Sequence, residues 1–184
     1  MSINNSKQNP WQFKDKKNIY ENPWIKVEEH DVIMPNGKEG IYGKVLFKNR
    51  AIAILPIDSQ GNTWLVGQYR YTIDEYSWEI PMGGGPLNED ILESAKRELK
   101  EETGLKAQKW TNIGKFHTSN SCTDEEGFIF LAEDLSQHET EFDETEVIEI
   151  MKVPFEKALD MVMNEKITDV ISCMAILKAS KLLF

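Results

Sequence analysis

Residues 83–105 read GGGPLNEDILESAKRELKEETGL, and this stretch carries the strongest structural signal in the chain. Asn88 is a favourable N-cap residue, the acidic residues after it complement the helix dipole, and Gly104 can end a helix in the left-handed conformation. The stretch therefore predicts a helix over 88–103 that follows a glycine loop. Its apolar side chains recur at helical spacing, as Leu92, Ala95 and Leu99.

The polar side of this helix brings three carboxylates together. Glu98, Glu101 and Glu102 are spaced by three and four residues, so their side chains lie close together on the helix surface. A hard divalent cation prefers carboxylate, carbonyl and water oxygens, and the loop at Met82–Gly83 can turn a backbone carbonyl toward such an ion. The alternative is an ordinary charged surface helix, on which nearby basic residues moderate the repulsion.

The spacing around the carboxylates is more specific than the carboxylates themselves. Gly83 is followed after five residues by Glu89 and, after seven more, by Arg97-Glu98-Leu99; Glu101-Glu102 and Gly104-Leu105 then follow after one residue each. This pattern resembles the Nudix box at every defined position. We interpret Glu89 and Arg97 as a pair that braces the helix. No Gly-Lys-Ser/Thr or Gly-x-Gly-x-x-Gly run is present, which excludes the NTPase phosphate loop and the dinucleotide-binding loop.

The resemblance implies a metal-dependent pyrophosphohydrolase. In the Nudix family the metals, Mg²⁺ or Mn²⁺, bridge a diphosphate and activate water for attack on one phosphorus. The implied general base is Glu144, with Glu101 as its rival, and the sequence leaves that choice open. The implied metal ligands are the side chains of Glu98, Glu101, Glu102 and Glu146 and the backbone carbonyl of Met82.

Motifs outside the box resemble one branch of the family, the ADP-ribose pyrophosphatases and nucleoside diphosphate sugar hydrolases. They are Gln68-Tyr69-Arg70, Trp78-Glu79-Ile80-Pro81 and Asp143-Glu144-Thr145-Glu146. This branch implies a small nucleoside diphosphate substrate, ADP-ribose or a related sugar, cleaved to a nucleoside monophosphate and a sugar phosphate. Nucleoside triphosphates and dinucleoside polyphosphates fit the same box. A Nudix domain that has lost catalysis and serves as a ligand sensor is the rival from another class.

Three residues are candidates for substrate binding. Only three of the 21 basic residues are arginines, and arginine suits bidentate phosphate contacts better than lysine does. Arg70, shortly before the glycine loop, is therefore a candidate phosphate ligand, with a surface salt bridge as the alternative. Glu79 can accept a hydrogen bond from a base amino group or serve as a strand-edge carboxylate. Trp24 can stack on a nucleobase, although packing at a core or dimer interface is the favoured interpretation.

Length, charge and cysteine content exclude several classes of protein. The 184 residues are 40% hydrophobic, which is enough for the core of one domain with a small appendage. The net charge of -10 disfavours nucleic acid or an anionic membrane as the main partner, since both need a basic face. No stretch resembles a membrane span or a signal peptide. Cys122 and Cys173 are too few for a disulfide framework and indicate a cytoplasmic protein.

The predicted fold class is α/β, a Nudix fold with a mixed β-sheet between helices and an N-terminal antiparallel β-subdomain. We expect residues 1–47 to form a tail and the subdomain, which resembles the one this branch uses to form homodimers, and residues 48–184 to form the hydrolase domain. Residues 1–20 are expected to fray and 72–87 to be irregular. The other expected elements are antiparallel hairpins over 24–47 and 51–71, strands over 109–116, 127–132 and 147–153, and helices over 154–165 and 169–182.

Overall fold

The computed structural model describes residues 8–140 and 147–183, and the chain forms two compact units. One unit is Met1–Lys48 with Ser119–Asp124, and the other is Asn49–Thr118 with Glu125–Phe184. Main-chain hydrogen bonds explain why a segment so far along the chain belongs to the first unit. Val45 donates its N–H to the carbonyl of Cys122 and accepts from the N–H of Asp124.

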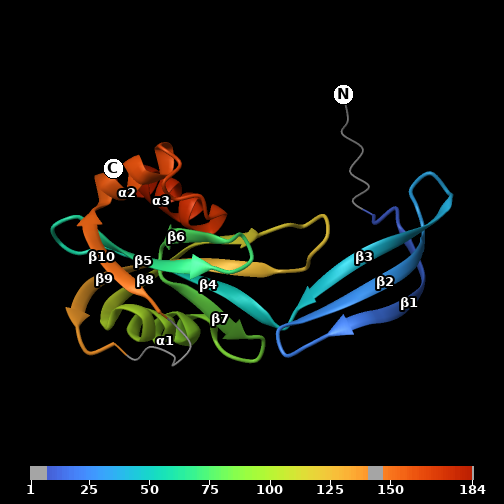
Figure 1. Cartoon of the computed structure of the whole chain (residues 1–184), viewed down its shortest axis with the longest axis horizontal. Helices are drawn as coiled ribbons and strands as arrows, with labels where there is room; N and C mark the ends of the chain where they lie inside the picture. The colour runs from blue at the N-terminus through green and yellow to red at the C-terminus, as the bar shows by residue number, and fades with distance from the viewer. Residues whose placement is uncertain (1–7, 141–146, 184) are drawn as a thin grey trace. The chain divides into compact units, whose positions relative to one another are not determined.

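The first unit is a three-stranded antiparallel sheet in the order β1-β2-β3, drawn in blue in Figure 1. Its strands are β1 (Gln12–Glu21), β2 (Ile25–Ile33) and β3 (Glu39–Phe47). Strands β2 and β3 confirm the hairpin predicted over 24–47, and Gly37 occupies a left-handed turn position with φ of 80°. The expectation that residues 1–20 fray is wrong for residues 12–20, because β1 pairs with β2 along its length; residues 1–7 lie outside the described residues. All side chains of β1 are exposed. The polar sequence therefore gave no sign of a strand that main-chain hydrogen bonds hold to β2.

A buried carboxylate organises the charges of this small sheet. Glu28 on β2 is only 3% exposed. Its carboxylate accepts hydrogen bonds from Lys16 Nζ at 2.8 Å and Lys26 Nζ at 2.7 Å, and it lies 2.9 Å from His30 Nε2. These hydrogen bonds hold the pKa of the Glu28 carboxyl well below its usual range. Lys16 of β1 therefore forms a cross-strand charge pair with Glu28, whereas Lys26 and His30 approach it from its own strand, β2.

The second unit contains two sheets. A four-stranded sheet has the order β7-β4-β9-β8, and a three-stranded sheet has the order β10-β5-β6. Strand β4 runs parallel to β9 and antiparallel to β7, which confirms the predicted mixed sheet. The strands are β4 (Asn49–Pro56), β5 (Asn62–Arg70), β6 (Glu75–Glu79), β7 (Met82–Pro86), β8 (Leu105–His117), β9 (Glu126–Gln137) and β10 (Glu149–Pro154).

Two predictions for the strands of this unit are wrong. Residues 51–71 do not form a hairpin, because β4 and β5 belong to different sheets. One isolated bridge, between Ile57 just after β4 and Thr63, connects the two segments. A strand that is apolar on both faces can pair with strands far along the chain, and not only with the next one. Strand β4 pairs with β7 and β9. Residues 72–87 are not irregular, since β6 and β7 occupy most of them. Glycines are weak strand formers, yet Gly83 to Gly85 pair with β4.

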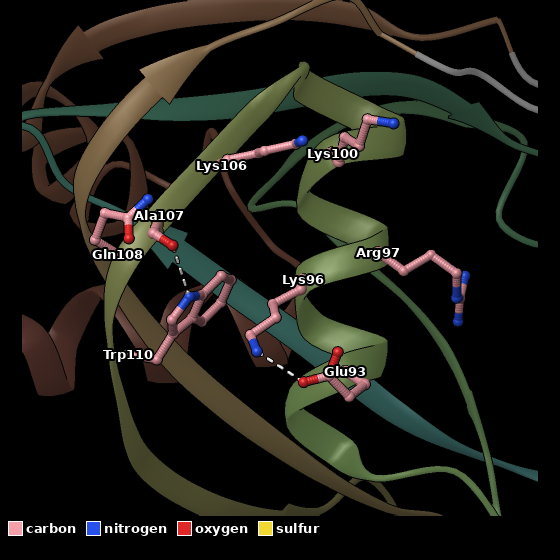
Figure 2. Close-up of a pocket in the computed structure, with 8 residues that line it drawn as sticks. All are labelled: Glu93, Lys96, Arg97, Lys100, Lys106, Ala107, Gln108 and Trp110. Carbon is pink, nitrogen blue, oxygen red and sulfur yellow. Dashed lines mark hydrogen bonds and ion pairs between the residues drawn. The ribbon is translucent and has the colours of Figure 1, made fainter.

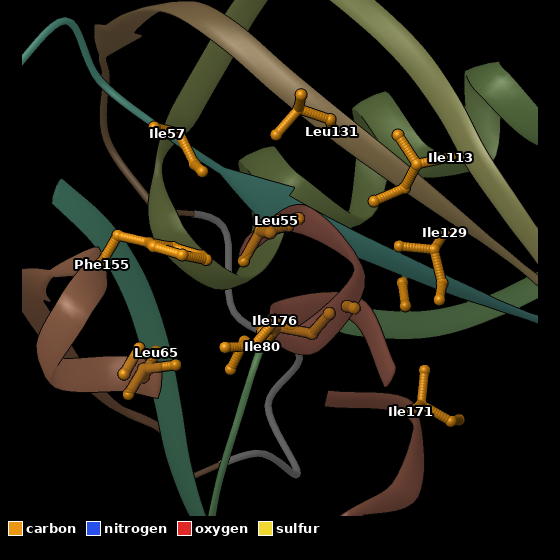
Figure 3. Packing of buried hydrophobic residues seen from close by; sticks show 14 of the residues in the cluster. Leu55, Ile57, Leu65, Ile80, Ile113, Ile129, Leu131, Phe155, Ile171 and Ile176 are labelled. Carbon is orange, nitrogen blue, oxygen red and sulfur yellow. The ribbon is translucent and has the colours of Figure 1, made fainter. Parts of the chain in front are cut away.

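Helices pack against both faces of β4. Alternate residues of this strand enter two clusters: Ile52 and Ile54 pack with the helix α1 (Ile91–Thr103), whereas Ala53 and Leu55 belong to the cluster that contains the C-terminal helices. Figure 3 shows the second cluster, with Leu55 close to Phe155 and Ile176. Helices α2 (Phe155–Met163) and α3 (Val170–Leu182) confirm the two predicted there. The central strand therefore fixes α1 against the sheet.

Within residues 8–140 and 147–183, we find no helix with the length and apolar character needed to cross a membrane.

Candidate active site

Helix α1 begins and ends at well-defined caps. The side chain of Asp90 accepts hydrogen bonds from the backbone N–H groups of Leu92, at 2.9 Å, and Glu93, at 3.3 Å. Asp90 is thus the N-cap, and the prediction that Asn88 holds this position is wrong. Both residue types are good caps, so local chemistry could not choose between them. Gly104 ends the helix as predicted, with φ of 68° and its N–H bonded to the carbonyl of Lys100 at 2.8 Å.

The three predicted carboxylates of α1 differ in burial. Glu98 is 8% exposed and Glu102 is 3% exposed, whereas Glu101 is half-buried. Acidic side chains are almost never buried to this extent unless they are paired, because removing a carboxylate from water is costly. A plain surface helix would leave all three in water, so the burial of Glu98 and Glu102 argues against that alternative.

The glycine strand β7 forms one wall around these carboxylates. The N–H of Met82 donates a hydrogen bond of 2.8 Å to Glu102 Oε2. The carboxylate of Glu98 occupies the place where a Cβ on Gly83 would stand. Only a residue without a side chain lets the carboxylate approach the strand so closely. Gly83 is therefore required here by space, since its backbone φ is not positive.

Arg97 connects the helix to the glycine strand. Its Nη1 donates to Glu98 Oε1 at 2.7 Å and to Glu101 Oε2 at 3.0 Å, and its Nη2 donates to the carbonyl of Gly84 at 3.0 Å. The predicted pair with Glu89 is confirmed, with Nη2 and Oε2 3.7 Å apart. Burial opposes the charge of Arg97, but the carboxylates of Glu98 and Glu101 outweigh it and raise the pKa of the guanidinium. Arg97 is therefore surrounded by the carboxylates of Glu89, Glu98 and Glu101.

The donor set has the chemistry that a hard divalent cation requires. Among residues 8–140 and 147–183, no three His, Cys, Asp or Glu side chains converge closely enough to enclose an ion by themselves. The carboxylates of Glu98, Glu101 and Glu102 nevertheless share one helix beside the Met82–Gly83 backbone, and oxygen donors of this kind are what Mg²⁺ and Mn²⁺ prefer. The other two predicted carboxylates, Glu144 and Glu146, lie outside the described residues.

Arg70 at the end of β5, which is partly exposed, pairs with the buried Glu79 at the end of β6. Arg70 Nε donates to Glu79 Oε1 at 2.8 Å, and Nη2 donates to Glu79 Oε2. Hydrogen bonding to Glu79 raises the pKa of Arg70 although burial opposes it. Glu79 is 3% exposed, and the next residue, Ile80, donates its N–H to Ser172 Oγ at 3.0 Å. This bidentate pair holds the planar guanidinium in one orientation.

Trp24 is the described candidate that lies in the small N-terminal sheet unit. It belongs to the first unit, whereas the other described candidates belong to the second. Its side chain is 67% exposed, so packing in the core of its own unit is excluded. Its N–H donates to Asn22 Oδ1 at 2.9 Å, which fixes the backbone and leaves the indole on the surface.

Two features of the site were missed by sequence reasoning. One is the double contact of Arg97 with Glu98 and Glu101, of which the second has an (i, i+4) spacing that sequence does show. The other is the pairing of Arg70 with Glu79. The two residues belong to adjacent strands, and a loop expected over 72–87 gave no reason to place them together.

Comparison with known proteins gives two family matches. Residues 47–171 match the model of the NUDIX domain. Residues 11–45 match the model of the nucleoside diphosphate sugar hydrolase N-terminal domain. The two matches abut within the chain and together include every predicted site residue.

Individual relatives match over most of their length. An ADP-ribose pyrophosphatase of Bacillus subtilis is 36% identical over 163 residues, which cover 88% of this chain and 88% of the relative. A methanol dehydrogenase activator of Bacillus methanolicus is 29% identical over 153 residues, 82% of each chain. A crystal structure of an ADP compounds hydrolase superposes with a TM-score of 0.85 at 23% identity, covers 94% of each chain, and has the same fold.

The space at Gly83 yields a test of the carboxylate site. In Gly83→Ala the added methyl group displaces the Glu98 carboxylate, which is the far end of a flexible side chain. We expect the affinity for Mn²⁺, measured by calorimetry, to fall by roughly tenfold or more, as when supporting groups of metal sites are altered. The free energy of unfolding in urea should change much less, because the side chain can move without disturbing the core.

Gly84→Ala is the matched control. A Cβ on Gly84 would meet Asn49 Nδ2 at 3.1 Å and no carboxylate. Its Mn²⁺ affinity should stay within about twofold of the unsubstituted protein, well inside the effect expected for Gly83→Ala. Equal losses in both variants would mean that the glycine strand matters for folding and not for the position of Glu98.

Proposed function

This chain belongs to the Nudix family, and from that premise we propose that it hydrolyses the diphosphate of ADP-ribose or of a related nucleoside diphosphate sugar. The products are a nucleoside monophosphate and a sugar phosphate. Relatives named as ADP-ribose pyrophosphatases match it at 36% identity over 163 residues and at 35% over 108 residues. The N-terminal match to a nucleoside diphosphate sugar hydrolase domain supports the same substrate class.

One observation carries the proposal: buried Glu98 and Glu102 lie on α1 beside the backbone of Met82 and Gly83. Nudix hydrolases generally need a divalent metal, and we propose Mg²⁺ or Mn²⁺ for this one. The side chains of Glu98, Glu101, Glu102 and Glu146 and the carbonyl of Met82 would hold it. Bound there, the metal neutralises diphosphate charge and lowers the pKa of a water molecule.

Arg70 supplies the protein's own positive charge to the substrate. Glu79 binds the edge of the guanidinium formed by Nε and Nη2. Among the hydrogen bonds of the described residues, none involves Nη1 of Arg70. We propose that Nη1 donates to a phosphate oxygen of the substrate. Glu79 acts through Arg70 as a positioning residue, and its role as an acceptor for a base amino group is the alternative. We propose that Trp24 stacks on the nucleobase, which its exposure permits.

The hydrolytic step needs one base. A water oxygen forms a bond to one phosphorus, the bond from that phosphorus to the bridging oxygen breaks, and the water proton passes to a carboxylate. We propose Glu144 as that carboxylate, with Glu101 as the alternative. Glu101 accepts a hydrogen bond of 3.0 Å from Arg97, so one of its carboxylate oxygens is already engaged by the guanidinium.

We also propose that the protein is a cytoplasmic homodimer that assembles through its first unit. Cys122 and Cys173 are both free thiols, as is usual in a reducing compartment. The small sheet exposes Phe13, Ile19 and Ile41 to 60%, 59% and 66%. Large exposed apolar side chains are candidates for burial in an interface, and the register places Phe13 and Ile41 on opposite faces of this sheet.

The first test replaces a buried carboxylate. Glu102→Gln keeps the size of the side chain and removes its charge, so we expect hydrolysis of ADP-ribose with Mg²⁺ to fall by roughly 10²-fold or more. Glu93→Gln, on the exposed side of the same helix, is the control and should keep its activity. A sensor would show no hydrolysis in the unsubstituted protein and would keep its ligand affinity in Glu102→Gln.

The substrate class is tested in the same assay. The panel contains ADP-ribose, GDP-mannose, UDP-glucose, NADH and deoxynucleoside triphosphates. We expect the diphosphate sugars to give the highest kcat/KM. Turnover of the triphosphates alone would contradict the proposed branch while leaving the hydrolase assignment intact.

The general base is tested by comparing Glu144→Gln with Glu101→Gln. Loss of a base lowers kcat by roughly 10² to 10⁴ and leaves the metal affinity unchanged. Loss of a ligand raises the metal concentration needed for half-maximal rate. We expect the first result for Glu144→Gln and the second for Glu101→Gln; the reverse pattern would assign the base to Glu101.

The dimer is tested by light scattering at micromolar concentration. We expect a mass near twice 21.2 kDa for the unsubstituted protein, and a monomer for Ile19→Glu combined with Ile41→Glu, because buried charges oppose association. Val170→Glu, at an exposed residue of α3, is the control and should remain dimeric. A monomeric mass for the unsubstituted protein would contradict the proposed homodimer.

A further inference from the structure

A pocket of about 350 Å³ lies between α1 and the start of β8. Figure 2 shows Lys96 and Lys106 extending into the space between the helix and the strand, whereas the Arg97 side chain turns away from it. This volume is within the range of small-molecule sites. The lining residues are Glu93, Lys96, Arg97, Lys100, Lys106, Ala107, Gln108 and Trp110.

The charge of the pocket is opposite to that of the chain. Four of the eight lining residues are basic and one is acidic, in a protein with a net charge of -10. Lys96 Nζ contacts Glu93 Oε1 at 2.7 Å, but both side chains are largely exposed. Exposed pairs of this kind contribute little, so a phosphate can replace Glu93 as the partner of Lys96. Lysine ammonium groups are common phosphate ligands.

Trp110 forms the apolar wall of the pocket. Its Nε1 donates to the carbonyl of Ala107 at 3.1 Å, and its ring packs edge-on against Phe130 with centroids 6.2 Å apart. The indole is half-buried, so part of its surface remains available to a ligand. Because these contacts already fix the ring, a planar group that packs on it costs little ordering of the protein. Aromatic side chains hold nucleobases in this way.

The pocket shares Arg97 with the candidate active site, but its other lining residues are separate from that site. Glu93, Lys96 and Lys100 follow one another along one face of α1 at spacings of three and four, whereas Glu98 and Glu102 are buried beside β7. None of the carboxylates proposed to hold the metal lines the pocket. A ligand there needs neither the metal nor the substrate-binding residues.

We propose that this pocket binds a small ligand that combines a phosphate group with a planar ring, the chemical class of a nucleoside monophosphate. The ammonium groups of Lys96 and Lys106, which extend into the space between α1 and β8, face the phosphate, and the exposed part of Trp110 packs on the ring. The site is independent of the proposed function, because it uses none of the residues assigned to hydrolysis.

The test follows binding of adenosine 5′-monophosphate to the full chain in excess EDTA by ¹H–¹⁵N spectra. We expect saturable shifts of the Trp110 indole N–H and of the backbone amides of residues 106–110. Lys106→Glu reverses one of the charges and should weaken this binding by at least about tenfold. Lys157→Glu makes the same change on α2, outside the pocket lining, and should leave the affinity within about twofold.

The site, the phosphate contact and the stacking on Trp110 can each be contradicted by a separate result. Unchanged affinity in Lys106→Glu, with spectra that show an intact fold, would overturn the site. Shifts confined to residues near Arg70 and Met82 would assign the binding to the candidate active site instead. Adenosine that binds as tightly as the monophosphate would overturn the phosphate contact, and inorganic phosphate that binds as tightly would overturn the stacking on Trp110. Loss of hydrolysis in Glu102→Gln bears on none of these outcomes.

Discussion

Two carboxylates of like charge are buried on one helix, and the surrounding structure has to compensate for that burial. Glu98 and Glu102 are four residues apart and both nearly inaccessible to solvent. Such carboxylates are stable only where donors or cations surround them. The N–H of Met82 and the guanidinium of Arg97 supply part of that compensation. A divalent cation is the further charge that this arrangement is suited to receive.

The strands and helices packed around α1 hold the carboxylates in position. Strand β4 contributes alternate residues to two apolar clusters, so α1 packs on one face while the C-terminal helices pack on the other. Strand β7, paired with β4, brings Gly83 against Glu98. Catalytic groups on packed helices and strands keep their geometry better than groups on loops. The glycine run, which looks like a flexible loop in the sequence, is part of that framework.

Sequence reasoning found the helix and its carboxylates because spacings of three and four are properties of any helix. It missed features that depend on pairing between distant segments. Strand β1 has exposed side chains throughout and shows no pattern. The contact between Arg70 and Glu79 required β6, in a segment expected to be irregular. Strand β8 begins at Leu105, four residues before the predicted start at 109, and Lys106 was therefore not seen to face α1.

The central claim is that the carboxylates of α1 hold the metal on which hydrolysis depends. Anomalous scattering from Mn²⁺ in crystals of the full chain, grown with a non-hydrolysable ADP-ribose analogue, tests it most directly. We expect a peak within bonding distance of carboxylate oxygens of Glu98 and Glu102. A peak elsewhere, with Glu98 still bonded to Arg97 and Glu102 still bonded to the N–H of Met82, would contradict it.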